Sequence, residues 1–419
     1  MSESTPPIWI EKRLEDIAEI TGGSTPSTDE PRFWGGNIPF VTPTDITKLK
    51  GDNYLEKTER TITKEGYEAI SSRLIKPGTV LMTSRATIGD CAINSIDVVT
   101  NQGFANFSSH GDIDNLWLLY LLRSKKSSFR KLASGSTFLE VARGSLRKVR
   151  VPVPPLIEQR GIAEVLGTAD EAIMRTDAII LKSEELKRGM MQRLLTRGIR
   201  HTEFKQTELG EIPKTWEIRT IEEAYSIYDC DHRTPQYLDN GVPIIRPRDV
   251  APFMYDFNSC SKISKEDYIE FTRRYIPKKE DIVYSRNASY GIAGFMISNE
   301  KYCIGQDMVI LTSNTNSNKY LFYVLNSNRI LHEIKKISTG STFKRINLAE
   351  IKKLKILLPP LDEQEKIMNI LWNIDVKKIT DVTNKMKIEK MKSGLMQILL
   401  SGRVRVRLDE GGLHRIRNS

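Results

Sequence analysis

Apolar residues recur at three- and four-residue spacing along two long stretches of the chain, and this pattern predicts two long amphipathic helices. Each stretch follows a proline pair, at 154–155 or 359–360, and then runs for about forty residues with few glycines and prolines. Proline cannot continue a helix inward, so each pair marks a start, while Gly198 and Gly402 mark the ends. Such a helix is about 60 Å long. The apolar positions assigned to helix–helix packing are Ile162, Leu166, Ala169, Ile173, Ile180, Met190, Leu194, Ile367, Leu371, Ile374, Leu395 and Leu399.

The spacing alone leaves two interpretations of these helices open. Each could fold as a helical hairpin on its own domain, or the two could pair with each other along a coiled-coil-like seam. Pairing is favoured, because amphipathic helices of equal length in one chain are natural partners. The second helix also carries lysines that predict either a solvated face or a strip facing phosphates. They are Lys377, Lys378, Lys385, Lys387, Lys390 and Lys392.

The segments in front of the two helices have a different pattern. Short runs rich in β-formers, at 38–41, 79–82, 281–284 and 308–311, alternate with clusters of Gly, Pro, Asn and Asp. Short helices are predicted at 116–122 and 320–325. The fold class predicted from this mixture is α+β, with two mixed α/β domains joined by two long antiparallel helices that form a coiled coil.

The chain is an internal repeat. Gly-Ser-Thr-Phe at 135–138 returns at 340–343, Pro-Pro-Leu at 154–156 returns at 359–361, and Glu-Gln at 158–159 returns at 363–364, each displaced by 205 residues. Further upstream the displacement drifts between 201 and 207 residues. The motif spacing is constant in the rear half of each copy and varies in the front half. This difference indicates a common structural frame that carries two different binding surfaces.

Five segments follow from the repeat and the helix signals. We expect a first domain at 1–155, a long helix at 156–198, a linker with a second domain at 199–360, a second long helix at 361–402 and a basic C-terminal tail at 403–419. The two domains and two helices together form a pseudo-twofold arrangement.

Charge and composition narrow the classes of protein. Lys and Arg total 63 against 53 Asp and Glu, a net charge of +10, which is compatible with a polyanionic partner. No apolar run approaches the length of a membrane span, and the first residues resemble no signal peptide; we expect a cytoplasmic protein. The four cysteines form no C-x-x-C pair, and nothing near Cys230 and His232 completes a ligand set, so neither disulfides nor a metal site is expected.

Several catalytic classes lack their sequence motifs. The chain contains no phosphate-binding glycine loop, no H-E-x-x-H and no G-x-S-x-G. The proline pairs are flanked by apolar residues, whereas an amino-methyltransferase would need a polar residue before them and an aromatic one after. No catalytic residue is therefore assigned.

Polar loops that mix Ser, Thr, Gly and Arg supply the candidate DNA-binding groups. Arg can bond guanine with two hydrogen bonds or clamp a phosphate, and Gly-Ser-Thr segments can offer N–H and hydroxyl donors. The same residues also serve as turn formers and helix caps, and this alternative stays open. The candidates are Ser84, Arg85, Gly135, Ser136, Thr137, Arg246, Arg248, Ser285, Arg286, Gly340, Ser341, Thr342, Lys344 and Arg345.

In their order along the chain, these motifs resemble the specificity (S) subunits of Type I restriction–modification systems. The resemblance rests on Gly-Gly-Ser-Thr-Pro at 22–26, Trp-Gly-Gly-Asn-Ile-Pro at 34–39, Gly-Glu-Ile-Pro-Lys-Thr-Trp at 210–216, the duplicated motifs above, and helices that end in Gly-Met-Met-Gln or Gly-Leu-Met-Gln. It covers essentially the whole chain, and its order and duplication are more specific than any single motif.

The resemblance implies a non-catalytic protein with two target-recognition domains, each of which recognises one half of a split double-stranded DNA site. It implies two methyltransferase (M) subunits that bind S-adenosylmethionine, and restriction (R) subunits that use ATP and Mg²⁺, so that no cofactor belongs to this chain. The helices would act as a ruler, and four residues inserted into one of them would lengthen it by about 6 Å. Alternatives are the recognition subunit of a Type IIB-like enzyme, an active methyltransferase, or a helical scaffold that does not bind DNA.

Overall fold

The computed structural model describes residues 9–71, 73–133, 139–254, 256–286, 291–338, 345–408 and 414–418. Its contacts divide the chain into two units: unit 1 comprises Met1–Ile179 and Asp381–Ser419, and unit 2 comprises Ile180–Thr380. Each unit therefore contains one front domain and parts of both long helices. Among the described residues, no helix is both long and apolar enough to cross a membrane.

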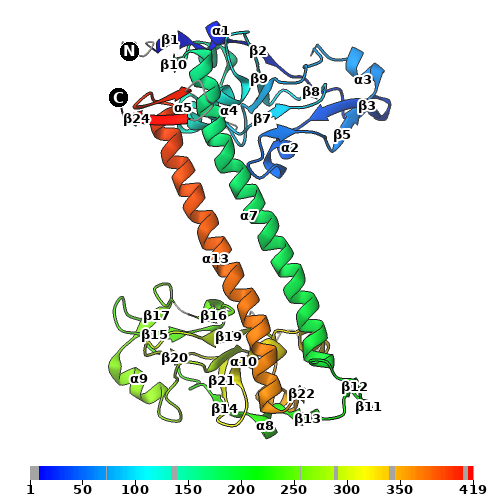
Figure 1. Cartoon of the computed structure of the whole chain (residues 1–419), viewed down its shortest axis with the longest axis vertical. Helices are drawn as coiled ribbons and strands as arrows, with labels where there is room; N and C mark the ends of the chain where they lie inside the picture. The colour runs from blue at the N-terminus through cyan, green and yellow to red at the C-terminus, as the bar shows by residue number, and fades with distance from the viewer. Residues whose placement is uncertain are drawn as a thin grey trace. The chain divides into compact units, whose positions relative to one another are not determined.

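The two long helices are α7, Leu156–Arg197, and α13, Leu361–Leu399. In unit 1 the first part of α7 lies beside the last part of α13, and in unit 2 the last part of α7 lies beside the first part of α13 (Figure 1). Asp170 pairs with Lys392, and Asp177 pairs with Lys385, so residue numbers rise on one helix as they fall on the other. The predicted antiparallel pairing is confirmed. Gly198 and Gly402 have φ values of +63° and +74°, as expected of residues that end a helix.

The lysines of α13 have a role that the sequence did not indicate. Lys378, Lys385 and Lys392 are spaced seven residues apart, which is two helical turns, and all three form ion pairs with carboxylates on α7. These three therefore form neither a solvated face nor a phosphate strip.

Unit 1 is built on a five-stranded mixed sheet of strand order β2-β9-β6-β7-β4, in which only the β4–β7 pair is parallel. A three-stranded sheet of order β5-β3-β8 accompanies it (Figure 1). The strands are β2 Ala18–Gly22, β3 Trp34–Val41, β4 Tyr54–Leu55, β5 Arg60–Ile62, β6 Val80–Thr83, β7 Cys91–Asn94, β8 Val99–Thr100 and β9 Phe104–Ser109.

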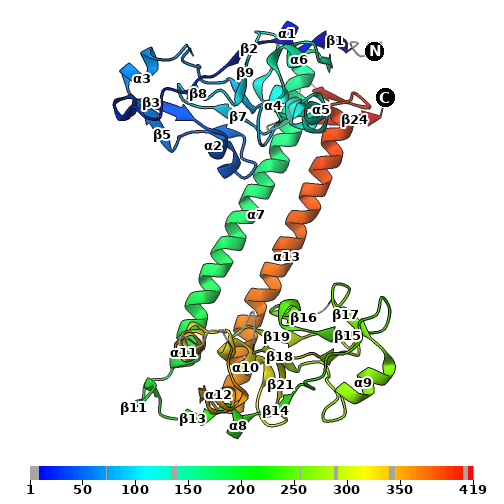
Figure 2. The same cartoon turned by 180° about the vertical axis from the view of Figure 1, so that it is seen from behind.

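Unit 2 repeats this topology. Its five-stranded sheet has the order β14-β21-β18-β19-β16, again with one parallel pair, and its three-stranded sheet has the order β17-β15-β20 (Figure 2). The strands are β14 Ser226–Asp229, β15 Val242–Ile245, β16 Phe253–Met254, β17 Ser261–Ile263, β18 Ile282–Ser285, β19 Ala293–Met296, β20 Cys303–Ile304 and β21 Met308–Thr312. The strands predicted at 79–82, 281–284 and 308–311 are confirmed to within one residue, and the run at 38–41 forms the second half of β3, which begins four residues earlier.

Each sheet packs against an apolar helix that the sequence predicted. In unit 1 this helix is α4, Asn115–Ser124, capped by Asp114, and in unit 2 it is α10, Asn318–Leu325, capped by Ser317. Six consecutive residues of each helix are buried, because the sheet covers one side and the long helices cover another. Ile162 and Leu166 of α7 join the core of unit 1, while Ile367 and Leu371 of α13 join that of unit 2.

The repeated Glu-Gln motif locks the start of each long helix. Gln159 accepts a hydrogen bond from the backbone N–H of Asp114 (2.8 Å), and Gln364 accepts one from that of Ser317 (3.0 Å), so each fixes the beginning of the packed helix. Each Gln also donates to a carbonyl of its own proline pair, at 2.9 Å. The motif has a structural function in both copies.

Short strand pairs brace the helix ends. β1, Ile10–Arg13, pairs with β10, Arg150–Val153, and β13, Glu217–Thr220, pairs with β22, Lys355–Leu358. The segment expected to be a basic tail instead contains the antiparallel strands β23, Val404–Leu408, and β24, His414–Asn418. A hairpin of β11, Phe204–Thr207, and β12, Gly210–Pro213, follows α7 in the same manner. The remaining helices are α1 Leu14–Ile17, α2 Pro43–Lys48, α3 Lys64–Glu68, α5 Lys126–Leu132, α6 Arg143–Arg147, α8 Ile221–Ala224, α9 Lys265–Phe271, α11 Asn328–Ser338 and α12 Leu348–Lys353.

Candidate nucleic-acid interface

In both units, three loops meet at the same end of the five-stranded sheet. In unit 1, β2 ends opposite the start of β9, and β6 ends beside it, with Thr83 opposite Phe104. In unit 2, β14 ends with Asp229 opposite Val309, and β18 ends with Ser285 opposite Met308. Antiparallel neighbours bring the end of one strand next to the start of the other, so both candidate Ser-Arg pairs lie at this sheet end.

A glutamine holds a Thr-Pro loop at this end in each unit. Gln102 is hydrogen-bonded to Thr25, and Gln306 donates to Thr234 Oγ1 at 3.3 Å. The two glutamines are 204 residues apart in the sequence. The two glutamines align within the repeat, but the sequence gives no sign of their function, because their partners lie on loops about 70 to 80 residues away.

The Ser84-Arg85 pair lies at the sheet end of unit 1. Ser84 is buried, and its backbone N–H donates to the carbonyl of Gly103 at 2.7 Å. The Arg85 guanidinium is 2.8 Å from the Glu140 carboxylate, and 43% of its side chain is exposed. Arg85 thus has a position from which it could reach DNA only by exchanging Glu140 for another acceptor.

The Ser285-Arg286 pair is buried in unit 2. Only 5% of Arg286 is exposed, and its guanidinium donates to Asp229 Oδ1 at 2.8 Å. Its backbone N–H donates to the carbonyl of Asp307 at 2.7 Å, while its carbonyl accepts from the N–H of Ile346 at 3.1 Å. Arg286 therefore connects three loops of the sheet end.

Three other predicted arginines differ in exposure. Arg246 has 16% of its side chain exposed and contacts Asp249 through Nε at 3.2 Å. Arg248 is 69% exposed, and Arg345 is 41% exposed with an ion pair of 2.8 Å to Asp307. Of these, Arg248 has its charge most open to a solvent-borne anion. The candidates Gly135, Ser136, Thr137, Gly340, Ser341, Thr342 and Lys344 lie outside the described residues.

The sequence missed an arginine-lined hollow in unit 1. A cavity of about 460 Å³ beside β2 is lined by Arg73, Arg143 and Arg147, together with Glu15 and Glu19. The three arginines come from two segments about seventy residues apart, and no local motif joins them. This hollow adds basic side chains to the surroundings of β2.

The side chains of Asp229, Cys230 and His232 bring a carboxylate, a thiol and an imidazole within 4.8 Å of one another. Asp229 is already bonded to Arg286, and the His232 side chain is 63% exposed. Burial raises the pKa of the Cys230 thiol, which opposes formation of the thiolate that a metal requires. A closed structural zinc site takes four protein ligands, whereas this cluster offers three.

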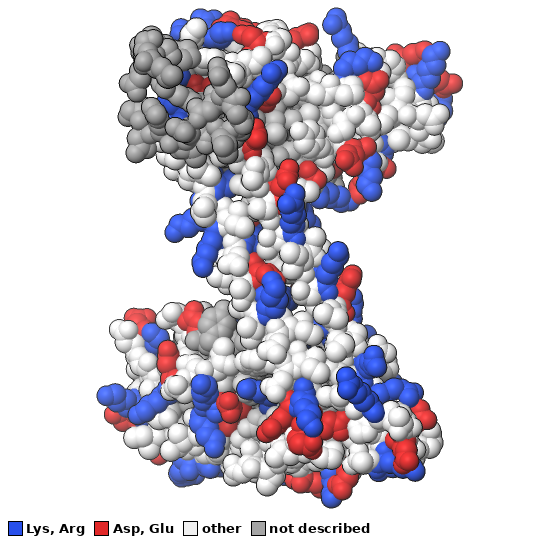
Figure 3. All heavy atoms as spheres, viewed as in Figure 1, with Lys and Arg blue, Asp and Glu red and all other residues white. Residues whose placement is uncertain are grey.

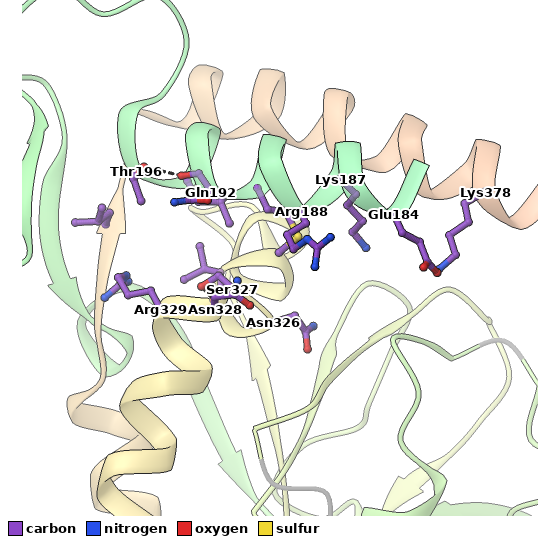
Figure 4. Close-up of a pocket in the computed structure, with 14 residues that line it drawn as sticks. Glu184, Lys187, Arg188, Gln192, Thr196, Asn326, Ser327, Asn328, Arg329 and Lys378 are labelled. Carbon is purple, nitrogen blue, oxygen red and sulfur yellow. Dashed lines mark hydrogen bonds and ion pairs between the residues drawn. The ribbon is translucent and has the colours of Figure 1, made fainter. Parts of the chain in front are cut away.

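A second concave surface lies in unit 2, where the last turns of α7 face the connection between α10 and α11. This cavity of about 550 Å³ has apolar walls that include Met191, Leu195 and Val324. Arg188 and Lys187 project from α7 on one side, and Ser327 and Asn328 lie on the other (Figure 4). Two of its lining lysines are already paired with carboxylates of the chain, Lys187 with Asp375 and Lys378 with Glu184.

Basic and acidic side chains are interspersed on the face of each unit shown in Figure 3. The net charge of +10 is therefore not concentrated in one basic patch on this face. On a surface of mixed charge, a few lysines and arginines contact a polyanion such as DNA. The affinity for DNA then falls as the salt concentration rises.

The architecture defines a class of protein: two α/β units of identical sheet topology, each with polar loops at one sheet end and each seated on an antiparallel helix pair. The family model described as "Type I restriction modification DNA specificity domain" matches residues 6–182 and 213–390. The chain belongs to this family and is a Type I restriction–modification specificity subunit.

Relatives and solved structures agree with this assignment. The MjaIX and MjaVIII Type I restriction enzyme specificity subunits of Methanocaldococcus jannaschii are 28% and 30% identical, and each alignment covers 96% of this chain and 94% of the relative. The crystal structure of the Type I restriction–modification S subunit from M. genitalium has a TM-score of 0.58 at 13% identity, with 96% of this chain and 98% of that chain covered. That structural similarity supports the fold alone.

Proposed function

We propose that each unit recognises one half of a bipartite DNA site with the loop-bearing end of its five-stranded sheet. The observation that carries this proposal is the duplication of that sheet end, with the same strand order and the same glutamine-held Thr-Pro loop. The surrounding loops differ between the units, as two different half-sites would require. Because a mismatched base pair costs only about 1–3 kcal/mol, two linked recognition domains select a rare site far better than one.

The helix pair is proposed to set the distance between the half-sites and to recruit M subunits. Large apolar side chains on both helices are strongly exposed, and exposed apolar groups of this kind favour a protein partner. They include Met174 (51%), Leu181 (61%), Leu186 (56%), Met386 (64%) and Met391 (66%). The basic, apolar-walled cavity at the end of α7 supplies a further contact surface.

Catalysis is proposed to reside in the partner subunits. S-adenosylmethionine would be bound by M subunits, which must flip the target base out of the duplex to methylate it, and ATP and Mg²⁺ would be used by R subunits.

Methylome sequencing of cells that express the chain with the M subunit of its own system tests the proposal. The expected result is a methylated motif of two short specific parts separated by a spacer of fixed length. Seven residues inserted after Ile179 on α7 and seven after Thr380 on α13 add about 10.5 Å to both helices and preserve their faces. We expect a spacer longer by about three base pairs, since each step along DNA is about 3.4 Å; an unchanged spacer would contradict the ruler.

A single arginine tests the interface itself. Arg248→Ala removes an exposed cation from the turn that follows β15, and we expect weaker DNA binding and a salt slope smaller by about one unit. Arg219→Ala, on β13 before the opposite end of β14, is the matched control and should leave both quantities unchanged. Equal losses in the two variants would place DNA elsewhere.

A further inference from the structure

Buried tyrosine–aspartate–lysine triads join each recognition domain to both long helices. In unit 1, Tyr120 of α4 donates to Asp170 Oδ2 on α7 at 2.6 Å, and Lys392 of α13 pairs with Asp170 Oδ1. The Lys392 ammonium also lies 5.1 Å from the centre of the Tyr120 ring. One carboxylate thus connects a recognition domain with two helices.

Unit 2 contains the same triad with the two helices exchanged. Tyr323 of α10 donates to Asp375 Oδ2 on α13 at 2.5 Å, and Lys187 of α7 donates to Asp375 Oδ1 at 2.7 Å. The Lys187 ammonium lies 5.2 Å from the centre of the Tyr323 ring. The two aspartates are 205 residues apart, and so are the two lysines. The repetition shows that the triad belongs to the structural frame that the two copies share.

The triads are much less exposed than the other ion pairs between the helices. The side chains of Asp170 and Asp375 are 12% and 5% exposed. By contrast, the side chains of Glu184 and Asp177, which pair with Lys378 at 2.5 Å and Lys385 at 2.7 Å, are 49% and 46% exposed. Burial lowers the pKa of Lys392 against the opposing effect of Asp170, and it raises the pKa of both tyrosines.

Burial makes the triads sensitive to helix register. Buried ion pairs contribute little net stability, but a buried charge without its partner is strongly unfavourable. A slip of one helical turn, about 5.4 Å, would separate each aspartate from the lysine on the other helix and leave both charges unpaired. The exposed ion pairs would lose much less free energy in such a slip, because water and salt ions can replace the missing partner.

We infer that the two triads fix the register of α7 against α13, and that Tyr120, Asp170, Lys392, Tyr323, Asp375 and Lys187 are positioning residues that determine the DNA spacer. This inference rests on the proposed function, because a spacer exists only if the two units recognise two half-sites. The residues touch no DNA, and they act through the position of the recognition domains on the helix pair.

A fourfold neutral variant tests the inference in the full chain with its M subunits. Asp170→Asn with Lys392→Met, combined with Asp375→Asn with Lys187→Met, removes both ion pairs without leaving a buried charge. Methylome sequencing gives the ratio of methylation at spacers one base pair longer or shorter to that at the parental spacer. We expect this ratio to rise by more than about twofold, and a ratio within twofold of the parent overturns the inference.

Two controls separate this effect from general damage. Asp177→Asn with Lys385→Met removes an exposed ion pair and should leave the ratio unchanged; an equal rise there overturns the assignment to the triads. If the fourfold variant does not fold, Tyr120→Phe with Tyr323→Phe is decisive, because it removes only the two phenolic hydrogen bonds and is judged by the same twofold criterion. Absence of any bipartite motif in the parent would instead contradict the proposed function.

Discussion

The two units hold the same triad in different surroundings. In unit 1, Asn53 donates to both Tyr120 (3.0 Å) and Asp170 (3.1 Å), and Arg123 donates to Asn53 at 2.6 Å. In unit 2, Phe322 packs edge-on against Tyr323 of the triad, with ring centres 4.9 Å apart. Phe253 and Phe295 lie against Phe322, and Trp372 of α13 packs edge-on against both of them. Unit 1 stabilises the attachment of its recognition domain to the long helices with a polar network, and unit 2 does so with aromatic contacts. The geometry of the frame is kept, while the chemistry around it changes.

The starts of the long helices show the same contrast. Glu158 accepts two hydrogen bonds of 2.7 Å from Arg405 and one of 3.0 Å from Trp9. Glu363 accepts one of 2.9 Å from Trp216 and is 2.7 Å from the ring of His201. In each unit, a glutamate at the start of one helix thus binds a tryptophan and the segment that follows the other helix.

The largest expected difference concerns the two tryptophans. Trp216 is fully buried, and Trp216→Ala should lower the free energy of unfolding of unit 2 by about 3–5 kcal/mol. Trp9→Ala should lower the free energy of unfolding of unit 1 by a smaller amount, because Trp9 is only half-buried. Chemical denaturation followed by hydrogen exchange in each unit measures both, and equal losses would show that the two sites are packed alike.

A smaller difference is expected for the glutamates. Glu158→Gln leaves the largely buried Arg405 without a carboxylate, and the expected cost is about 2–3 kcal/mol. Glu363→Gln keeps one acceptor oxygen, for either Trp216 or the backbone N–H of Ile199, and leaves no arginine without a carboxylate, so we expect about 1–2 kcal/mol. The same denaturation experiment compares them, and a larger loss for Glu363→Gln would reverse the ranking.

The polar network of unit 1 is expected to contribute less to the free energy of unfolding than the Glu158–Arg405 pair. Asn53→Ala removes donors to Tyr120 and Asp170 and an acceptor for Arg123, and should cost about 1–2 kcal/mol. Val324→Ala on α10 changes a buried apolar position of unit 2 and serves as a size control. If Asn53→Ala had no effect on stability, the polar network would be incidental to the attachment.

The repeat, the helix ends and the principal strands were predictable, because they depend on local signals. Proline pairs start α7 and α13, glycines follow their ends, and short runs of β-formers mark strands such as β6 and β21. These features need no knowledge of distant partners. The displacement of 205 residues then extends each local prediction to a second copy.

The function of individual charged residues was not predictable, because it depends on partners far away in the sequence. Lys392 meets Asp170, 222 residues away, and Arg286 meets Asp229, 57 residues away. A basic residue that follows a strand has the same sequence pattern whether it faces DNA or a buried carboxylate. Only the three-dimensional arrangement distinguishes the exposed Arg248 from the enclosed Arg286.

The smallest expected difference between the two units is in the reactivity of their buried cysteine thiols. Burial raises the pKa of Cys91 in unit 1 to about 12 and that of Cys260 in unit 2 to about 11. Only the thiolate reacts with iodoacetamide, so at pH 8 both should be labelled far more slowly than in the unfolded chain. As the pH rises, Cys260 should react first, because its pKa is the lower of the two. Peptide mass spectrometry after timed labelling measures the two rates, and faster labelling of Cys91 would mean that unit 1 opens more readily than unit 2.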